Sequence, residues 1–270
     1  QLGLDDTALN MLKMIIAKPH GIVLVTGPTG SGKTTTLYTA LQLLNKPDVK
    51  ILTVEDPVEY QMEGINQIQV KPQIGLTFAN ALRSIVRQDP DVIMIGEIRD
   101  LETAQIAVQS ALTGHMVIST LYTNDASSTV NRLLDMGVED YLLTSTVNGI
   151  LAQRLVRSLC RACREPYEPL PEVVQEFDLK RFAGDSPIVL YRPVGCESCG
   201  GTGYTGRLGI MEMLPMTDTI RSLIMRHAVS GEIRRQAIEE GMQTLYEDGL
   251  RKVIAGVITL DEVLRVTRED

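Results

Sequence analysis

A glycine-rich stretch near the start of the chain has the residues needed to hold a phosphate. Residues 27–34 read Gly-Pro-Thr-Gly-Ser-Gly-Lys-Thr, which fits the P-loop pattern, in which two glycines enclose four residues and precede Lys and Thr. The glycines allow backbone N–H groups to turn towards an anion, and the start of a following helix favours negative charge. We expect Lys33 to bridge the β- and γ-phosphates of a nucleotide and the Thr34 hydroxyl to ligate Mg²⁺.

The residues on either side predict the elements that position this stretch. Residues 21–26 form an apolar run typical of a buried strand, and residues 35–44 carry Leu and Ala at the spacing of one helix face. Strand, glycine loop and helix in this order favour nucleotide binding over an ordinary glycine turn. The predicted nucleotide-binding residues are Gly27, Pro28, Thr29, Gly30, Ser31, Gly32, Lys33, Thr34 and Thr35.

A carboxylate ends another predicted strand. Glu97 follows the apolar run Val92–Ile95, and a carboxylate in this place can orient or deprotonate a water that attacks the γ-phosphate. The alternative is a solvated acid at a strand end. The usual pattern has Asp before this Glu, but here the position is Gly96, so Mg²⁺ would depend on Thr34, phosphate oxygens and waters.

Other charged residues have two interpretations each. Glu55, Asp56 and Glu59 follow the predicted strand 50–54 and fit a solvated loop as well as a site. The arginines could reach phosphate across a subunit boundary or form structural ion pairs. A lone histidine at the start of a strand is more often a hydrogen-bonding core residue than a catalyst. These last candidates are Arg83, Arg87, Arg99 and His115.

All four cysteines of the chain lie in two Cys-x-x-Cys pairs, Cys160 with Cys163 and Cys196 with Cys199. Each pair places two thiolates on one tight turn, and two such turns complete a tetrahedral zinc site of structural type. Disulfides and free thiols are the alternatives. An ATP-using protein without a signal peptide is expected in the cytosol, which disfavours disulfides.

The composition is that of a globular protein. The 270 residues allow one large or two unequal domains, and the net charge of −8 argues against a broadly basic nucleic-acid surface. No apolar run reaches the length of about 18 residues that spans a bilayer. The chain begins with Gln1, which predicts a piece of a longer protein. Any membrane contact is expected through partners or further segments.

Strands alternate with helices over residues 21–157, which predicts an α/β fold with a parallel sheet and helices on both faces. The predicted helices here include residues 125–136 and 141–157. Composition shifts after Leu159 to Cys, Pro and Gly, followed by a short predicted strand at 207–214 and four helices. We expect a P-loop core at 1–157, a zinc-binding element at 158–206 and a mostly helical subdomain at 207–270.

Four motifs together resemble those of one family. Residues 27–37, 53–60, 82–104 and 113–121 resemble, in this order, the Walker A, Asp box, Walker B and His box of the secretion ATPase superfamily of type II secretion and type IV pilus assembly. The cysteine pairs followed by residues 203–210 resemble the tetracysteine element of its secretion and pilus-assembly branch. Residues 101–109 resemble the type II secretion members most closely. The resemblance covers nearly the whole chain.

The resemblance implies a RecA-like P-loop fold and roles for individual residues. Besides Lys33, it implies that Glu97 positions water and Mg²⁺, that Glu59 helps to handle the attacking water, and that His115 senses the γ-phosphate. The second His-box position is Tyr122 in this chain. Tyr can donate a hydrogen bond but cannot carry positive charge.

The resemblance also implies a function. It implies Mg-dependent ATP hydrolysis by a hexameric ring at the cytoplasmic face of the inner membrane, where it acts on platform and linker proteins. ATP is preferred over GTP on family grounds, and type II secretion is not separated from pilus assembly. A DNA translocase is disfavoured by the acidic balance and the cysteines. A non-catalytic, nucleotide-gated scaffold stays open.

Overall fold

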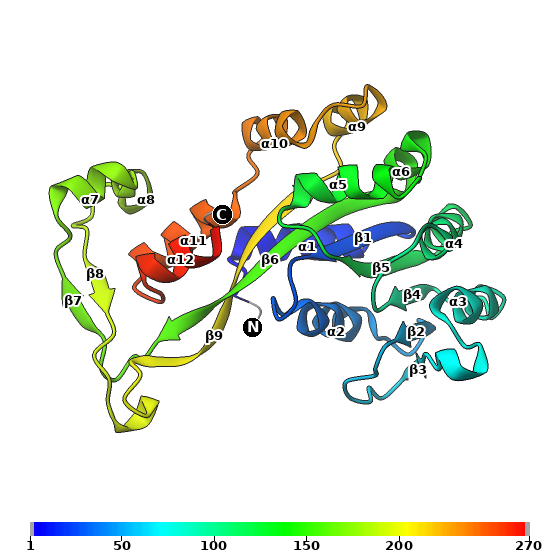
Figure 1. Cartoon of the computed structure of the whole chain (residues 1–270), viewed down its shortest axis with the longest axis horizontal. Helices are drawn as coiled ribbons and strands as arrows, with labels where there is room; N and C mark the ends of the chain where they lie inside the picture. The colour runs from blue at the N-terminus through cyan, green and yellow to red at the C-terminus, as the bar shows by residue number, and fades with distance from the viewer. Residues whose placement is uncertain (1–2, 268–270) are drawn as a thin grey trace. The chain divides into compact units, whose positions relative to one another are not determined.

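A largely parallel sheet forms the framework of the chain, as expected for an α/β fold. The computed structural model describes residues 3–267, and within this range seven strands pair in the order β3-β2-β4-β5-β1-β6-β9 (Figure 1). All the pairings among β1 to β5, and that of β1 with β6, are parallel. The strands are β1 (Gly21–Thr26), β2 (Ile51–Glu55), β3 (Ile65–Gln69), β4 (Val92–Ile95), β5 (Met116–Leu121), β6 (Val147–Leu159) and β9 (Tyr204–Pro215).

The chain divides into two compact units. The core unit comprises residues 5–153 and 213–242, and the described part of the cysteine unit comprises residues 3–4, 154–212 and 243–267. Strands β6 and β9 therefore each contribute residues to both units. These units cut across the segments 1–157, 158–206 and 207–270, whose functional division stays a prediction.

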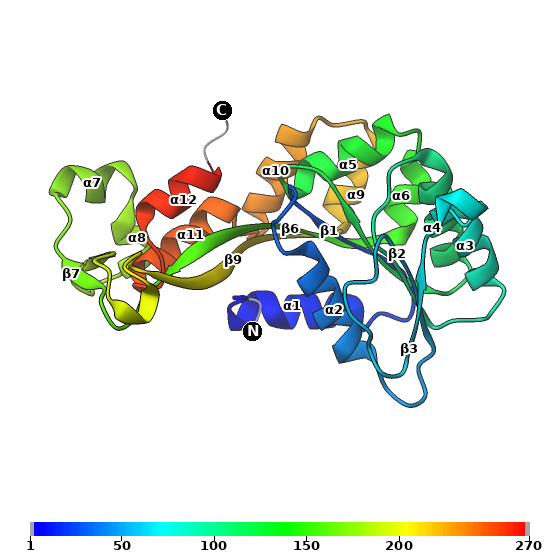
Figure 2. The same ribbon diagram turned by 60° about the horizontal axis from the view of Figure 1, so that its bottom comes forward.

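Helices cover both faces of the sheet in the core unit (Figure 2). Helices α1 and α2 lie on one face, and α4, α5 and α6 lie on the other. Because both faces are covered, every residue of the central strand β1 is buried. Helix α3 packs against α4, and α9 and α10 pack against α6 and α5. The bounds are α1 (Asp6–Ile16), α2 (Lys33–Leu44), α3 (Phe78–Val86), α4 (Leu101–Leu112), α5 (Ala126–Asp135), α6 (Asp140–Thr146), α9 (Asp218–Met225) and α10 (Ser230–Glu239).

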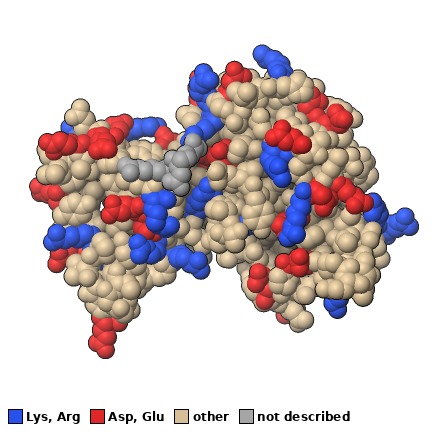
Figure 3. Space-filling view, in the orientation of Figure 1, with Lys and Arg blue, Asp and Glu red and all other residues tan. Residues whose placement is uncertain are grey.

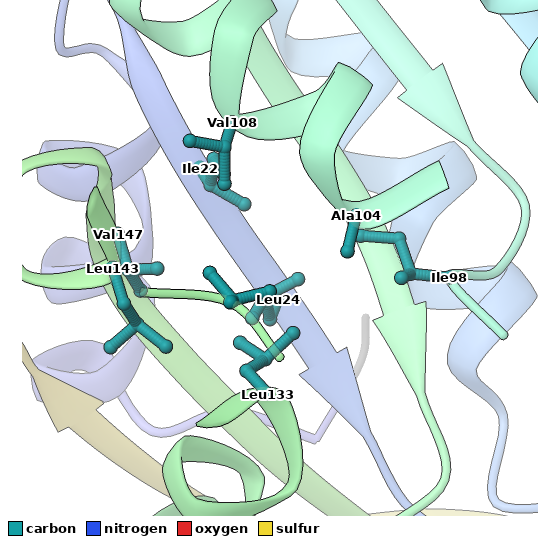
Figure 4. A pocket seen from close by; sticks show the side chains of 9 residues that line it. Ile22, Leu24, Ile98, Ala104, Val108, Leu133, Leu143 and Val147 are labelled. Atoms are coloured by element: carbon teal, nitrogen blue, oxygen red, sulfur yellow. The ribbon is translucent and has the colours of Figure 1, made fainter. Parts of the chain in front are cut away.

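An apolar pocket lies between β1 and helices α4 to α6 (Figure 4). Its lining side chains are aliphatic, so the pocket offers no group for acid–base chemistry or metal binding. It belongs to the packing of the sheet against its helices. The lining residues are Ile22, Leu24, Ile98, Ala104, Val108, Leu133, Val138, Leu143 and Val147.

The predicted helix over residues 141–157 is wrong in its second half. Helix α6 ends at Thr146, and Val147–Leu159 is strand β6, which pairs with β1. Residues 147–153 are all buried, and a fully buried strand has an apolar run that periodicity alone does not distinguish from a helix. Gly149 marks the close packing, because a Cβ there would lie 2.8 Å from Ile15 Cδ1.

The cysteine unit combines short strands and helices. Strand β7 pairs antiparallel with β8, and α11 packs against α8, α12 and β8. Helices α11 and α12 are two of the four helices predicted after the strand at 207–214, and both are confirmed. The elements are β7 (Glu165–Tyr167), β8 (Leu190–Arg192), α7 (Pro171–Glu176), α8 (Leu179–Ala183), α11 (Leu245–Ile254) and α12 (Leu260–Thr267), with a 3-10 turn at Glu197–Cys199. Another 3-10 turn, Pro72–Ile74, lies in the core unit.

A buried carboxylate ties α12 to β6 within the cysteine unit. Glu262 is 1% exposed and accepts hydrogen bonds from the guanidinium groups of Arg157 (2.8 Å) and Arg265 (2.8 Å). Burial raises the pKa of Glu262, but the hydrogen bonds from Arg265 and Arg157 outweigh it and lower the pKa to about 2.

We expect Glu262→Gln to lower the free energy of unfolding by about 2 kcal/mol at pH 7. This is less than the full pKa difference would give, because both guanidinium groups are half exposed and water screens their charge. A lowered folded-state pKa contributes stability above the unfolded pKa of about 4.3, and this contribution is lost as the pH falls towards 2. Urea unfolding at pH 7, 5 and 3 measures the difference, with exposed Glu172→Gln as the control. An equal loss at pH 7 and pH 3 would show that the charge of Glu262 is not its source.

Candidate nucleotide-binding site and cysteine cluster

Four strand ends meet at the sheet edge that carries the glycine-rich loop. Strands β2, β4, β5 and β1 are parallel neighbours in this order, so the residues that follow them share one edge, where ligands of parallel sheets bind. The glycine-rich loop follows β1 and Glu97 follows β4. Because β5 lies between these two strands, Tyr122 lies between the loop and Glu97.

The loop has the backbone geometry of a phosphate cradle. Gly27 has φ 147°, and a Cβ there would lie 2.4 Å from the carbonyl oxygen of Gln153. Gly30 and Gly32 have φ 79° and 88°, in the left-handed region that favours glycine. The N-terminus of α2 has no side-chain cap, and Thr34 and Thr35 are exposed on its first turn. Its first N–H groups therefore fit an anionic phosphate.

Lys33 lies inside this loop. Its ammonium donates hydrogen bonds to the carbonyl oxygens of Gly27 (2.8 Å) and Pro28 (3.0 Å). The same ammonium lies 4.2 Å from the ring centroid of Tyr122. A positive charge is thus held at the uncapped start of α2, which suits a phosphate between the loop and the helix.

Gln153 supports the loop from β6. Its side-chain amide donates to the carbonyl oxygen of Ser31 (2.7 Å) and accepts from the Thr36 hydroxyl (2.6 Å). Gln153 is absent from the predicted site residues because the sequence pattern predicts a helix over residues 141–157. The available signal was a polar amide directly after the apolar residues 149–152.

Glu97 is held by Arg99 from its own loop and lies near Tyr122, the residue after β5. It is 9% exposed, and the Arg99 guanidinium donates to its carboxylate at 2.5 Å. Burial raises the pKa of Tyr122, as do the charge of Glu97 and a hydrogen bond to it. At Gly96, a Cβ would lie 3.3 Å from the Val54 carbonyl oxygen. The position that usually carries Asp is therefore crowded by β2.

Of the acidic residues at and after the end of β2, Glu55 is buried and Glu59 is exposed. Glu55 is buried, and its carboxylate accepts from Tyr38, Thr53 (2.5 Å) and Gln67 (3.1 Å). Burial and the hydrogen bond with Glu55 raise the pKa of Tyr38 to about 12. Glu55 is thus a satisfied structural carboxylate. Glu59 is exposed in the loop after β2, at the same edge as the glycine-rich loop.

His115 lies at the opposite edge of the sheet. It precedes β5, and its carbonyl oxygen accepts from the N–H of Gly21 at the start of β1. Its Nδ1 lies 2.9 Å from the Ser110 carbonyl oxygen. The length of β5, about 16 Å at strand rise, separates it from the glycine-rich loop. Within one chain His115 therefore lies away from the phosphate loop, and its role as a sensor of the γ-phosphate stays a prediction.

Arg83 forms an ion pair with Glu102 (2.5 Å) between α3 and α4, and both side chains are half exposed. This matches the structural interpretation of the arginines. Arg99 instead pairs with the candidate catalytic carboxylate.

The four cysteines converge in the cysteine unit. All four sulfur atoms lie within 4.8 Å of one another. The pairs Cys160–Cys196, Cys163–Cys199 and Cys196–Cys199 are 3.8, 3.8 and 3.7 Å apart. A tetrahedral ion with zinc–sulfur bonds of about 2.3 Å separates its ligands by about 3.75 Å, whereas a disulfide needs about 2.05 Å. The arrangement fits a zinc ion.

Backbone N–H groups donate to two of the four sulfur atoms, Cys163 and Cys199. Gly195 donates to Cys163 Sγ (3.3 Å), and Cys196 and Gly203 donate to Cys199 Sγ (3.1 and 3.2 Å). Burial raises the pKa of Cys199, but the N–H donors outweigh it and lower the pKa to about 6. Burial and the neighbouring thiols raise the pKa of Cys163 to about 11. Metal binding requires the deprotonated form.

The parallel sheet and its phosphate loop define the chain as a P-loop α/β protein. A family model described as "Type II/IV secretion system protein" matches residues 1–265. The chain belongs to this family.

Three curated relatives match the chain from end to end. The type II secretion system protein E of Xanthomonas campestris pv. campestris is 63% identical over 269 residues, which cover 100% of this chain and 47% of the relative. The type II secretion system ATPase E of Vibrio cholerae is 52% identical (99% and 52% covered). The type IV pilus assembly ATPase PilB of Myxococcus xanthus is also 52% identical (100% and 48%). The chain thus spans about half the length of these relatives.

A solved structure has a similar fold. The pilus retraction motor PilT with bound ADP aligns with a TM-score of 0.69 at 29% identity and covers 99% of this chain and 66% of PilT. Within residues 3–267, none of the helices has the length and apolar character needed to cross a membrane.

Proposed function

We propose that this chain is the ATP-hydrolysing part of a motor that powers type II protein secretion. One observation carries the proposal: the uncapped start of α2 and Lys33 lie beside Tyr122, and Tyr122 lies beside the buried carboxylate of Glu97. A phosphate site next to a carboxylate suits attack of water on a γ-phosphate. The relatives named type II secretion proteins and ATPases support the same activity.

Each residue has a proposed part in the reaction. The N–H groups of residues 29–34 hold the triphosphate, and Lys33 exchanges its contacts with loop carbonyls for phosphate oxygens. Thr34 ligates Mg²⁺, which when bound neutralises charge on the β- and γ-phosphates. Glu97 orients and deprotonates the water. Glu59 assists from the exposed loop after β2.

The surroundings of the motor are proposed from the family. We assign this chain to a hexameric ring that acts on inner-membrane platform and linker proteins from the cytoplasmic face. The four cysteines would hold a structural zinc ion. Pilus assembly is the alternative, because PilB matches as well as several type II relatives. The greater identity to the Xanthomonas protein favours secretion.

Charge speaks against a DNA translocase. The net charge is −8, and on the face in Figure 3 the Lys and Arg side chains are interspersed with Asp and Glu. Backbone binding of DNA requires a basic surface. Addition of duplex or single-stranded DNA is expected to leave ATP hydrolysis unchanged, and a large stimulation would favour the translocase.

We expect Lys33→Ala in the full-length protein to weaken the binding of Mg-ATP by at least about tenfold and to abolish phosphate release. The reason is that the substitution removes the positive charge and its hydrogen bonds to phosphate. Equilibrium binding of a fluorescent ATP analogue and steady-state phosphate release measure these effects. Lys46→Ala, an exposed lysine just after α2, is the matched control. Normal turnover by Lys33→Ala would overturn the assignment of the site, and binding without turnover by the wild type would leave a nucleotide-gated scaffold.

A further inference from the structure

Tyr122 connects the two halves of the proposed reaction site. It directly follows β5, whose neighbours β1 and β4 carry the phosphate loop and Glu97. The face of its ring lies 4.2 Å from the Lys33 ammonium, and the side chain is close enough to Glu97 for that carboxylate to raise the pKa of Tyr122. The side chain is 52% exposed, so it stands at the open surface of the site.

The backbone beside Tyr122 is tied to the strand that leads into the phosphate loop. The N–H of Thr123 donates to the hydroxyl of Thr26 (3.0 Å), and the two threonine hydroxyls lie 2.5 Å apart. The Thr123 hydroxyl also pairs with that of Thr129 on α5 (2.6 Å). Thr26 immediately precedes Gly27, so these hydrogen bonds fix the backbone beside Tyr122 relative to the phosphate loop.

The charges around Tyr122 suit a neutral aromatic side chain. Lys33 faces it from α2, and Glu97 and Arg99 face it from the loop after β4. The charge of Asp56, after β2, raises the pKa of Arg99. An aromatic ring attracts an ammonium without adding charge. A phenol donates to a carboxylate and stays protonated at neutral pH. An imidazolium in this place would repel the ammonium of Lys33.

We propose that Tyr122 is a positioning residue that steadies the Lys33 ammonium with its ring and the Glu97 carboxylate with its hydroxyl. It thereby aligns the phosphate loop and the water-activating carboxylate across β5. This inference rests on the proposed ATP hydrolysis.

Two substitutions in the full-length protein separate the ring from the hydroxyl. Tyr122→Phe loses the hydroxyl, so we expect kcat to fall about tenfold, because a hydrogen bond to a charged group is lost. The substitution keeps the ring, so we expect the Kd for ATP to change less than about twofold. Tyr122→Leu also loses the ring, so we expect the Kd to rise about threefold in addition. Tyr141→Phe, an exposed tyrosine on α6, is the control with unchanged kinetics. Wild-type kcat in Tyr122→Phe, or wild-type Kd in Tyr122→Leu, would overturn the corresponding role.

A pH profile distinguishes positioning from a loss of folding. Tyr122→His introduces a group that titrates near neutral pH, so we expect the ratio of kcat at pH 8 to kcat at pH 6 to differ from that of the wild type by at least about threefold. Superimposable profiles would contradict the inference. Glu97→Gln is measured alongside, and if it hydrolyses ATP normally, the proposed function itself fails. If Glu97→Gln is inactive but the Tyr122 variants keep wild-type kcat and Kd, only the role of Tyr122 is overturned.

Discussion

Replacing Glu97 with Gln is expected to lower the turnover of Mg-ATP by at least about 100-fold while ATP binding stays within about twofold. A positioned general base contributes roughly 100-fold to 10,000-fold to the rate, and Gln keeps the size of the side chain but cannot accept a proton. The side chain lies just outside the phosphate loop, is held by Arg99, and raises the pKa of the neighbouring Tyr122. Single-turnover hydrolysis and equilibrium ATP binding measure the two quantities separately.

Glu63→Gln is the matched control for this substitution. Glu63 is exposed in the loop between β2 and β3, and its change removes the same charge from the chain. We expect its turnover to equal that of the wild type. If Glu97→Gln retained more than about a tenth of the wild-type turnover, another group would have to activate the water.

Replacing Cys199 with Ser is expected to have the largest effect on structure. The substitution removes one of four sulfur ligands and the sulfur that accepts two backbone N–H groups. Structural zinc sites contribute about 10–16 kcal/mol of binding free energy to folding in small zinc domains. We therefore expect the zinc content to fall from about one per chain to a small fraction, and residues 160–203 to become sensitive to protease.

Elemental analysis of the purified protein and limited proteolysis at Arg161 and Arg164 measure these two effects. Ser198→Ala changes an exposed residue between two of the ligands and is expected to keep both zinc and protease resistance. A wild-type protein without zinc and without free thiols after denaturation would contradict the metal site and indicate disulfides instead.

The sites that depend on residues close in sequence were predictable. The phosphate loop requires glycines and Lys33 at fixed spacing, and each cysteine pair forms one tight turn. The caps of α3 by Thr77 and of α12 by Thr259 are equally local, since a cap acts within its own first turn.

The remaining features depend on strand order and burial. Strand β6 was assigned to a helix because it is buried on both faces, which removes the alternation that marks a strand. The position of His115 required knowledge of which end of β5 faces the phosphate loop. The contacts of Tyr122 with Lys33 and Glu97 follow from β5 lying between β1 and β4, an order that no local pattern encodes.

A crystal structure of the full-length protein with Mg²⁺ and a non-hydrolysable ATP analogue tests the nucleotide site most directly. We predict that the triphosphate lies against the backbone N–H groups of residues 29–34 and that the Lys33 ammonium contacts its oxygens. The Glu97 carboxylate is expected to be separated from the γ-phosphate by a single water. A nucleotide bound elsewhere, or a Glu97 carboxylate turned away from the γ-phosphate, would contradict ATP hydrolysis at this site.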